Sequence, residues 1–145
     1  KRNRQMSQGC VLIVDDEPIN LVLLESLLED HYQVKSASSA QEAWAICQSD
    51  ASGIDVILSD VLMPGMSGYQ LCQTLKSHAH TKDIPVLLVS SLDGEDDQVV
   101  GLNAGAADLI NKPYSPDLLL TRVRTQMRIR KMSLTLQAHG WVETP

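Results

Sequence analysis

The sequence has no phenylalanine, and aromatic residues make up only 3% of its 145 residues. It also lacks any apolar stretch of the roughly 20 residues that a membrane-spanning helix requires. The first residues are polar and basic, and no apolar segment typical of a secretion signal follows them. We therefore expect a cytoplasmic protein that makes no membrane contact.

Cysteine and positive charge are also scarce. The chain has 3 cysteines, and Cys10, Cys47 and Cys72 lack the spacing of a metal site or a disulfide framework. Each falls within an apolar segment, so we expect reduced thiols in or near the core. The 12 basic residues stand against 18 acidic ones, which gives a net charge of −6. That balance argues against direct nucleic-acid binding.

What the sequence does have is a series of short runs rich in valine, isoleucine and leucine, which is typical of strands buried on both faces. Helical patterns lie between them, with start signals such as Pro18, a capping box at residues 39–42, and Ser115 before Pro116. Strand and helix alternate five times, which predicts a three-layer (βα)5 α/β sandwich around a five-stranded parallel sheet. The expected strands are residues 10–14, 33–37, 54–60, 84–89 and 107–110.

Polar and charged side chains stand where these strands end. Asp15 and Asp16 follow the first strand, and Asp60 ends the third. Ser90 ends the fourth strand, and Lys112 follows the fifth. Because the carboxyl ends of parallel strands share one edge of the sheet, we expect these groups to meet there. Two carboxylates about 4 Å apart repel by about 4 kcal/mol at an effective dielectric near 20, so the pattern predicts a metal and phosphate site.

Further motifs accompany the residues at the strand ends. Met63-Pro64-Gly65 and Gly68 follow Asp60, and Pro113 follows Lys112. Together with the Asp15-Asp16 pair and Ser90, this set resembles the receiver domain of response regulators over about residues 11–128. The resemblance implies a doubly wound, flavodoxin-like sheet of strand order 2-1-3-4-5. It also implies that Asp60 accepts a phosphoryl group from a sensor histidine kinase or a phosphotransfer domain.

The resemblance implies Mg²⁺ as the cofactor. Asp16 and Asp60 would bind the ion directly, and Asp15 would bind it through water. The backbone carbonyl of Leu62 would supply a further oxygen, and such hard ligands suit Mg²⁺. The chain would then be a regulatory phosphoacceptor rather than an enzyme.

The family pattern also gives roles to the other strand ends. Lys112 would pair with Asp60 before transfer and with a phosphoryl oxygen afterwards, and Ser90 would donate its hydroxyl to another oxygen. A cis bond before Pro113 would aim Lys112 into the site. Leu109 departs from the pattern, because the family usually has an aromatic residue there that swings inward on phosphorylation. Leu62 also departs, since polar residues are common two positions after the phosphoacceptor.

Other functions compete with this interpretation. A Mg²⁺-dependent phosphohydrolase could use Asp60 as its nucleophile, but such enzymes usually carry a second acid where this chain has Leu62. A flavodoxin-like binder of flavin or nucleotide would need a phosphate-cradling glycine-rich loop, which is absent. A degenerate receiver is disfavoured because the acceptor, metal and lysine positions are all retained.

The last predicted helix is longer than a domain helix usually is. Its apolar residues continue from Leu118 to Leu136, and five basic residues between Arg122 and Lys131 meet no acid along the helix. We expect either a solvated basic face or a helical lead into a homodimer contact or an attached domain. The chain is thus divided into a flexible lead-in (1–9), a receiver domain (10–128) and a helical extension (129–145). We expect a multidomain parent, either a hybrid histidine kinase or a regulator with an output domain.

Overall fold

The strands and helices alternate along the chain as the sequence predicts. The computed structural model describes residues 8–50, 53–91 and 95–140, so most of the predicted lead-in and the end of the predicted extension lie outside the described residues. The elements are β1 (Cys10–Val14), α2 (Pro18–Leu28), β2 (Gln33–Ala37), α3 (Ala40–Asp50), β3 (Val56–Asp60), α4 (Gly68–Lys76), β4 (Val86–Ser90), α5 (Glu95–Asn103), β5 (Asp108–Asn111) and α6 (Pro116–Ala138).

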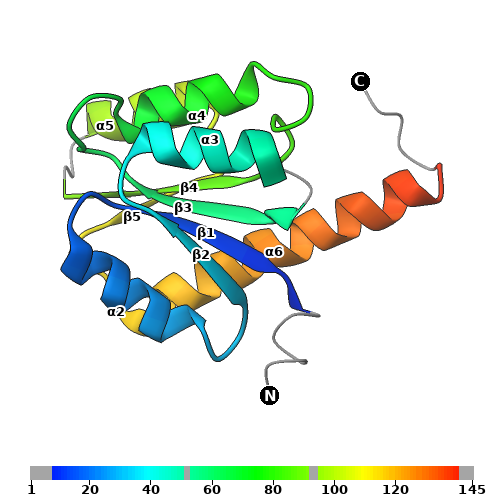
Figure 1. The fold of residues 1–145 in the computed structure, drawn as a ribbon, viewed down its shortest axis with the longest axis horizontal. Coiled ribbons are helices and arrows are strands. Elements are labelled where there is room, and N and C mark those ends of the chain that lie inside the picture. Colours follow the sequence, from blue (N-terminus) through cyan, green and yellow to red (C-terminus); the bar gives the residue numbers. More distant parts are fainter. Residues whose placement is uncertain (1–7, 51–52, 92–94, 141–145) are drawn as a thin grey trace.

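The sheet has five strands in the order β2-β1-β3-β4-β5. Every neighbouring pair is parallel, and this confirms the predicted doubly wound α/β sandwich. Helices α2 and α6 cover one face, while α3, α4 and α5 cover the other (Figure 1). The order reverses at β1, so the β1 and β3 ends flank the crevice where ligands bind in such sheets.

Both faces of the central strands are buried. Leu12 and Ile57 belong to the core under α3 and α4, whereas Ile13 and Leu58 belong to the core under α2 and α6. Side chains alternate between the two faces of a strand, so an almost continuous apolar run fills both cores. The three cysteines are free and buried, as the sequence predicts.

The helix starts differ in one detail from the sequence prediction. Ser39 accepts a hydrogen bond from the backbone N–H of Glu42, but Glu42 reaches back to the N–H of Ser38 instead of Ser39. A reciprocal capping box forms at α4, where Ser67 and Gln70 each accept from the other's backbone N–H. Ser115 caps α6 with Pro116 behind it, as predicted.

Gly68 allows the chain to turn tightly after β3. A Cβ atom at this position would collide with the backbone carbonyl oxygen of Asp60 and lie 3.0 Å from the Val61 Cα. We expect Gly68→Ala to lower the free energy of unfolding by about 1–3 kcal/mol, because backbone cannot move aside as a side chain can.

Gly101 in α5 provides a matched control for that substitution. A Cβ there would meet its nearest neighbours at ordinary distances of 3.6 Å or more, and alanine favours the helix by up to about 1 kcal/mol. Urea unfolding of both variants tests the difference. Equal effects of Gly68→Ala and Gly101→Ala would contradict the proposed close approach at Gly68.

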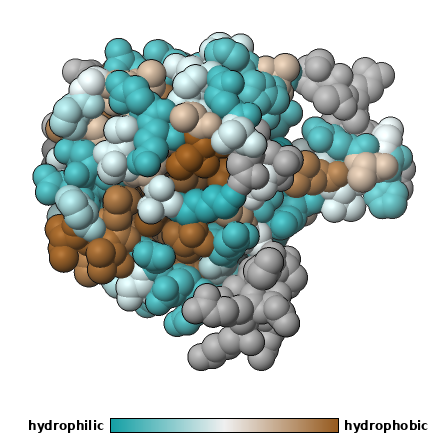
Figure 2. Space-filling model, in the orientation of Figure 1, coloured by the Kyte–Doolittle hydropathy of each residue, from teal (hydrophilic) through white to brown (hydrophobic). Residues whose placement is uncertain are grey.

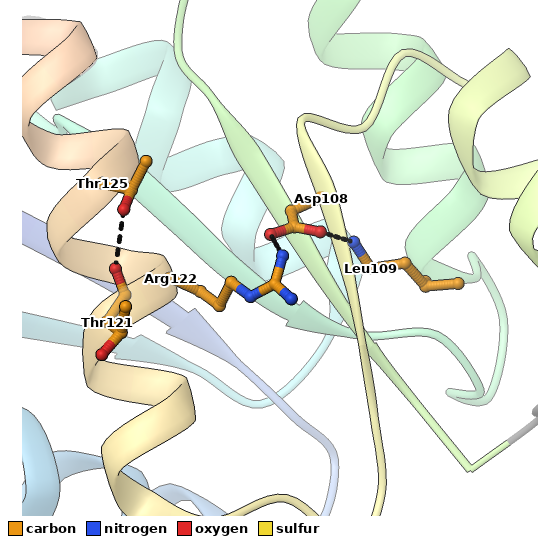
Figure 3. Close-up of polar contacts among 5 residues, drawn as sticks. All are labelled: Asp108, Leu109, Thr121, Arg122 and Thr125. Carbon is orange, nitrogen blue, oxygen red and sulfur yellow. Dashed lines mark hydrogen bonds and ion pairs between the residues drawn. The ribbon is translucent and has the colours of Figure 1, made fainter.

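The basic residues of α6 lie mostly on an exposed face, and two of them also form ion pairs. Arg122 donates to Asp108 of β5 at 2.8 Å, and Figure 3 shows this pair bridging α6 and the sheet edge. Lys131 lies 3.7 Å from Asp55, just before β3. Sequence patterns missed both pairs because the acids lie outside the helix, in β5 and just before β3.

Candidate functional site

The predicted acids meet at the carboxyl edge of the sheet. Asp15 directly follows β1, Asp60 ends β3, and these two strands are neighbours. Asp15, Asp16 and Asp60 each offer a carboxylate oxygen, and these oxygens lie within 4.8 Å of one another. Asp15 is buried and also accepts a hydrogen bond from the backbone N–H of Glu17 at 3.0 Å. One small cation could therefore contact all three side chains.

Lys112, which follows β5, reaches Asp60 from the opposite side of the site to β1. Its backbone N–H donates to the carbonyl of Ser90 at 2.7 Å, which holds the segment after β5 against the end of β4. The Lys112–Pro113 bond is cis, as the family resemblance implied. The Lys112 Nζ lies 3.0 Å from Asp60 Oδ1. Ser90 itself is buried at the end of β4.

The charges of the site shift the pKa values of both partners. Burial raises the pKa of Asp60 above its ordinary value, and nearby Asp15 adds to this, while the hydrogen bond from Lys112 opposes it. Burial lowers the pKa of Lys112, but the hydrogen bond and charge of Asp60 outweigh burial, so the net shift is upward. The lysine therefore stays charged beside a carboxylate that is costly to ionise.

A cavity of about 450 Å³ opens beside these groups. Asp15, Asp60 and Lys112 line it, and its other lining residues include Asn20 and Leu24 of α2, Ser91 and Tyr114. Asn20 and Leu24 carry no sequence motif of their own, because they lie within an ordinary helical pattern. They lie four residues apart near the start of α2, and this spacing, which places them on one face of the helix after the β1 end, was the available signal.

Leu109 and Leu62 are the two positions that depart from the family pattern, and their surroundings differ. Leu109 packs against the core under α3 and α4, and Figure 3 shows it pointing to the opposite side of β5 from Asp108 and Arg122. Leu62 follows the end of β3 and is 57% exposed. Its exposed apolar side chain occupies the second position after Asp60 in the sequence.

The chemistry of the donor set suits a hard divalent cation. The three aspartates supply only oxygen ligands, and no sulfur or imidazole group belongs to the cluster. Few carboxylates with room for water are typical of Mg²⁺ sites. The nearby ammonium of Lys112 suits an anion of the phosphate type.

A comparison with protein families identifies the family to which this chain belongs. The model of the response regulator receiver domain matches residues 11–124. The chain belongs to the receiver domain family. The family resemblance inferred from the strand-end residues is thereby confirmed. Receiver domains generally bind Mg²⁺ at an acidic pocket, and this chain has a cluster of three aspartates at the corresponding edge of its sheet.

Known proteins agree with this membership. The response regulator PleD of Caulobacter vibrioides is 40% identical over 121 residues, covering 83% of this chain and 26% of PleD. PilH of Pseudomonas aeruginosa is 37% identical over 114 residues, covering 78% of this chain and 93% of PilH. This chain thus spans about a quarter of PleD and nearly all of PilH.

Solved structures share the fold. The signal receiver domain of a signal transduction histidine kinase from Syntrophus aciditrophicus is 36% identical, with a TM-score of 0.77 over 83% of this chain and 90% of that one. The chemotaxis protein CheY4 of Vibrio cholerae is 30% identical, with a TM-score of 0.75 over 81% of this chain and 97% of that one.

These relatives define the class of function. The chain is a receiver domain of two-component signal transduction, which is a regulatory class of domain. Such domains interact with histidine kinases and are often fused to output domains. Among the described residues, none of the helices has the length and apolarity to cross a membrane.

Proposed function

We propose that Asp60 is the phosphoacceptor of this receiver domain and takes its phosphoryl group from the phosphohistidine of a sensor histidine kinase or phosphotransfer domain. The observation that carries the proposal is the position of its carboxylate, 3.0 Å from the Lys112 ammonium and within reach of two further acids. A nucleophilic carboxylate needs a cation on each side when an anionic phosphoryl group approaches.

The chemical step is a phosphoryl transfer between two side chains. A carboxylate oxygen of Asp60 attacks phosphorus, the P–N bond to the donor imidazole breaks, and an acyl phosphate forms on Asp60. Lys112 releases the carboxylate and pairs with a phosphoryl oxygen. Ser90 then donates its hydroxyl to another oxygen of the new group. Both residues lie on neighbouring strand ends that β4 and β5 hold in register.

Mg²⁺ is the cofactor we propose for this step. Asp16 and Asp60 would hold the ion directly, Asp15 through water, and the backbone carbonyl of Leu62 would complete the protein ligands. When bound, the ion would offset the negative charge of the acids and of the phosphoryl oxygens. The described donor set supports this choice because it contains carboxylate oxygens alone.

The surface beside the cavity supports a protein donor. Ile19, Val22 and Leu23 on α2 are 63%, 60% and 54% exposed. Figure 2 shows a hydrophobic patch in the region of α2, next to the cavity that Asn20 and Leu24 line. A partner that covered this patch would bring a histidine to the mouth of the site, and exposed apolar patches often mark such contacts.

Incubation with acetyl phosphate and Mg²⁺ tests the proposed acceptor chemistry without a cognate kinase. We expect the intact mass of the chain to increase by one phosphoryl group. The increase should disappear when a chelator is added. A chain that gains no phosphoryl group from any small donor at saturating Mg²⁺ would contradict the proposal.

Leu62 is expected to lengthen the lifetime of the acyl phosphate. Its exposed apolar side chain stands two residues after Asp60, where a polar side chain could orient an attacking water molecule. We expect Leu62→Asn to speed loss of the phosphoryl group several-fold, measured by intact mass after the donor is removed. Leu62→Met provides an apolar control, and an unchanged rate in Leu62→Asn would count against this role.

We also propose the limits of the domain and its setting. The receiver unit would span residues 10–128, and residues 129–145 would lead into an attached domain, although α6 runs through this boundary without a break. The whole protein would be a hybrid histidine kinase or a regulator with an output domain. Its location would be cytoplasmic, with no direct contact of this domain to membrane or nucleic acid.

A further inference from the structure

Two histidines and a tryptophan form a cluster at the edge of the sheet opposite the acids. Helix α4 begins after the Asp60 end of β3 and runs back to the start of β4, so the turn between α4 and β4 lies at the amino edge of the sheet. His78 and His80 are exposed in this turn, and we call them the histidine pair. Their ring centroids lie 4.7 Å and 6.4 Å from that of Trp44. Trp44 belongs to α3, which lies beside α4 (Figure 1).

The backbone of the turn that carries the histidine pair is held in place at several points. The carbonyl of His78 accepts hydrogen bonds from the backbone N–H groups of Thr81 at 3.2 Å and Lys82 at 2.9 Å. The hydroxyl of Thr81, which is buried, donates to the carbonyl of Leu75 at 2.7 Å. The Nζ of Lys76 donates to the carbonyl of Lys82 at 2.9 Å. The turn therefore presents both imidazoles from a fixed backbone, which lowers the entropy cost of binding a ligand.

A backbone hydrogen bond sets the proton on the ring of His78. Its Nδ1 lies 2.8 Å from the carbonyl oxygen of Thr74. A carbonyl oxygen can only accept, so Nδ1 carries the proton, and in a neutral imidazole Nε2 keeps its lone pair. Metal-binding histidines commonly donate their other ring N–H to a carbonyl in this way, which fixes the tautomer and the ring orientation. His78 is thus arranged as an Nε2 ligand, with the ring of Trp44 against it.

His80 supplies a second imidazole at nearly the distance that a shared ion requires. The ring centroids of His78 and His80 lie 6.2 Å apart, with the ring planes at 78° to each other. Two imidazoles that each bind one ion through a bond of about 2 Å have their ring centres roughly 5 Å apart. The two rings would therefore have to approach by roughly 1 Å. Rotation of exposed side chains allows this change without movement of the backbone.

The donor atoms of the histidine pair select a different class of ion from the aspartates. Imidazole nitrogen suits copper, zinc and nickel, whereas Mg²⁺ takes oxygen ligands. We propose that His78 and His80 form a second metal site of this domain, which takes a divalent transition ion of the copper and zinc type. The Nε2 of His78 and one ring nitrogen of His80 bind the ion, and water fills its remaining positions. Cu²⁺ should bind most tightly, as it does at nitrogen sites in general. The proposal does not depend on phosphorylation of Asp60.

Quenching of Trp44 fluorescence tests the site with Cu²⁺ alone as the probe. A paramagnetic ion on the histidine pair would lie close to the indole ring, because His78 is 4.7 Å from it. Trp141→Phe removes the other tryptophan of the sequence, so Trp44 reports alone in this parent variant. We expect saturable quenching that excess Zn²⁺ reverses and Mg²⁺ does not. Absence of quenching, quenching that does not saturate, or reversal by Mg²⁺ would overturn the proposal.

Single substitutions in the parent variant separate the histidine pair from other surface groups. We expect His78→Gln and His80→Gln each to weaken the binding of Cu²⁺ at least about tenfold, since loss of a ligand should cost no less than loss of its hydrogen-bond partner. His31→Gln changes an exposed histidine in the turn between α2 and β2 and is the matched control, which should bind as the parent does. Electron paramagnetic resonance should show two imidazole nitrogens on Cu²⁺ in the parent and one in either variant of the pair. Equal affinity in all three variants would refute the site.

Discussion

Substitution of Asp60 by asparagine is expected to abolish phosphoryl transfer to this receiver domain. An amide oxygen is a poor nucleophile and cannot form the acyl phosphate, so intact mass after incubation with acetyl phosphate and Mg²⁺ should stay unchanged. Asp83→Asn removes an exposed acid away from the site and should be labelled like the wild type. Labelling that persists in Asp60→Asn would move the acceptor to another residue.

The same variant should fold and be more stable without a metal ion. Two carboxylates about 4 Å apart repel by about 4 kcal/mol at an effective dielectric near 20, and the substitution removes this repulsion. It also removes the ion pair with Lys112, which offsets part of the stabilisation. We therefore expect the free energy of unfolding to rise by about 1 kcal/mol at neutral pH. Chemical denaturation measures this change, and a clear loss of stability would contradict the electrostatic account.

The difference in the free energy of unfolding between Asp60→Asn and the wild type should change with pH in a defined direction. Burial raises the pKa of Asp60 in the folded state. The Asp60 carboxyl therefore contributes to the free energy of unfolding at low pH, where it is protonated, and this contribution is lost as the pH rises through the raised pKa. The stability advantage of Asp60→Asn should accordingly shrink as the pH is lowered from neutral towards the pKa of an ordinary carboxyl. Denaturation at several pH values tests this, and an advantage that grew on acidification would contradict the sign.

Loss of the proposed metal site is expected to have the second large effect. We expect Asp16→Asn or a chelator to slow labelling by acetyl phosphate at least about a hundredfold, because a bound divalent ion supplies several kcal/mol of charge stabilisation. Mg²⁺ should also stabilise the wild type, by about 2.7 kcal/mol at a hundredfold excess over its Kd. Labelling rates and thermal unfolding measure the two effects.

Two controls separate ion binding from general effects. Asp83→Asn should respond to Mg²⁺ as the wild type does, and potassium chloride of equal ionic strength should not replace Mg²⁺. If Asp16→Asn kept both the rate and the thermal stabilisation, Asp16 would not be a ligand. If salt alone gave the same stabilisation, screening of the three acids would explain it.

The fold was readily predictable because its signals are local and repeated. Strand β3 is an apolar run that is buried on both faces and ends on Asp60. The chain turns after it, and Gly68 has no side chain there because a Cβ atom would collide with the backbone of Asp60. The order of the strands is less evident from periodicity. It followed from the family resemblance, since strand patterns alone do not fix which strands are neighbours.

The contacts that escaped prediction join residues far apart in the sequence. The pair Arg122–Asp108 connects α6 to β5, and helix periodicity carries no information on charges in a strand. The cavity lined by Asn20 and Leu24 arises where α2 passes the strand ends, so no local motif marks it. The strand-end acids were predictable because parallel strands bring their carboxyl ends to one edge.

The most direct test of the account is chemical identification of the phosphorylated residue. Borohydride reduction of the labelled chain converts an aspartyl phosphate to homoserine, and peptide sequencing by mass spectrometry locates it. We predict homoserine at position 60 and nowhere else, only in samples treated with both donor and Mg²⁺. Homoserine at position 15 or 16, or labelled protein without any homoserine, would contradict the central claim that Asp60 is the phosphoacceptor.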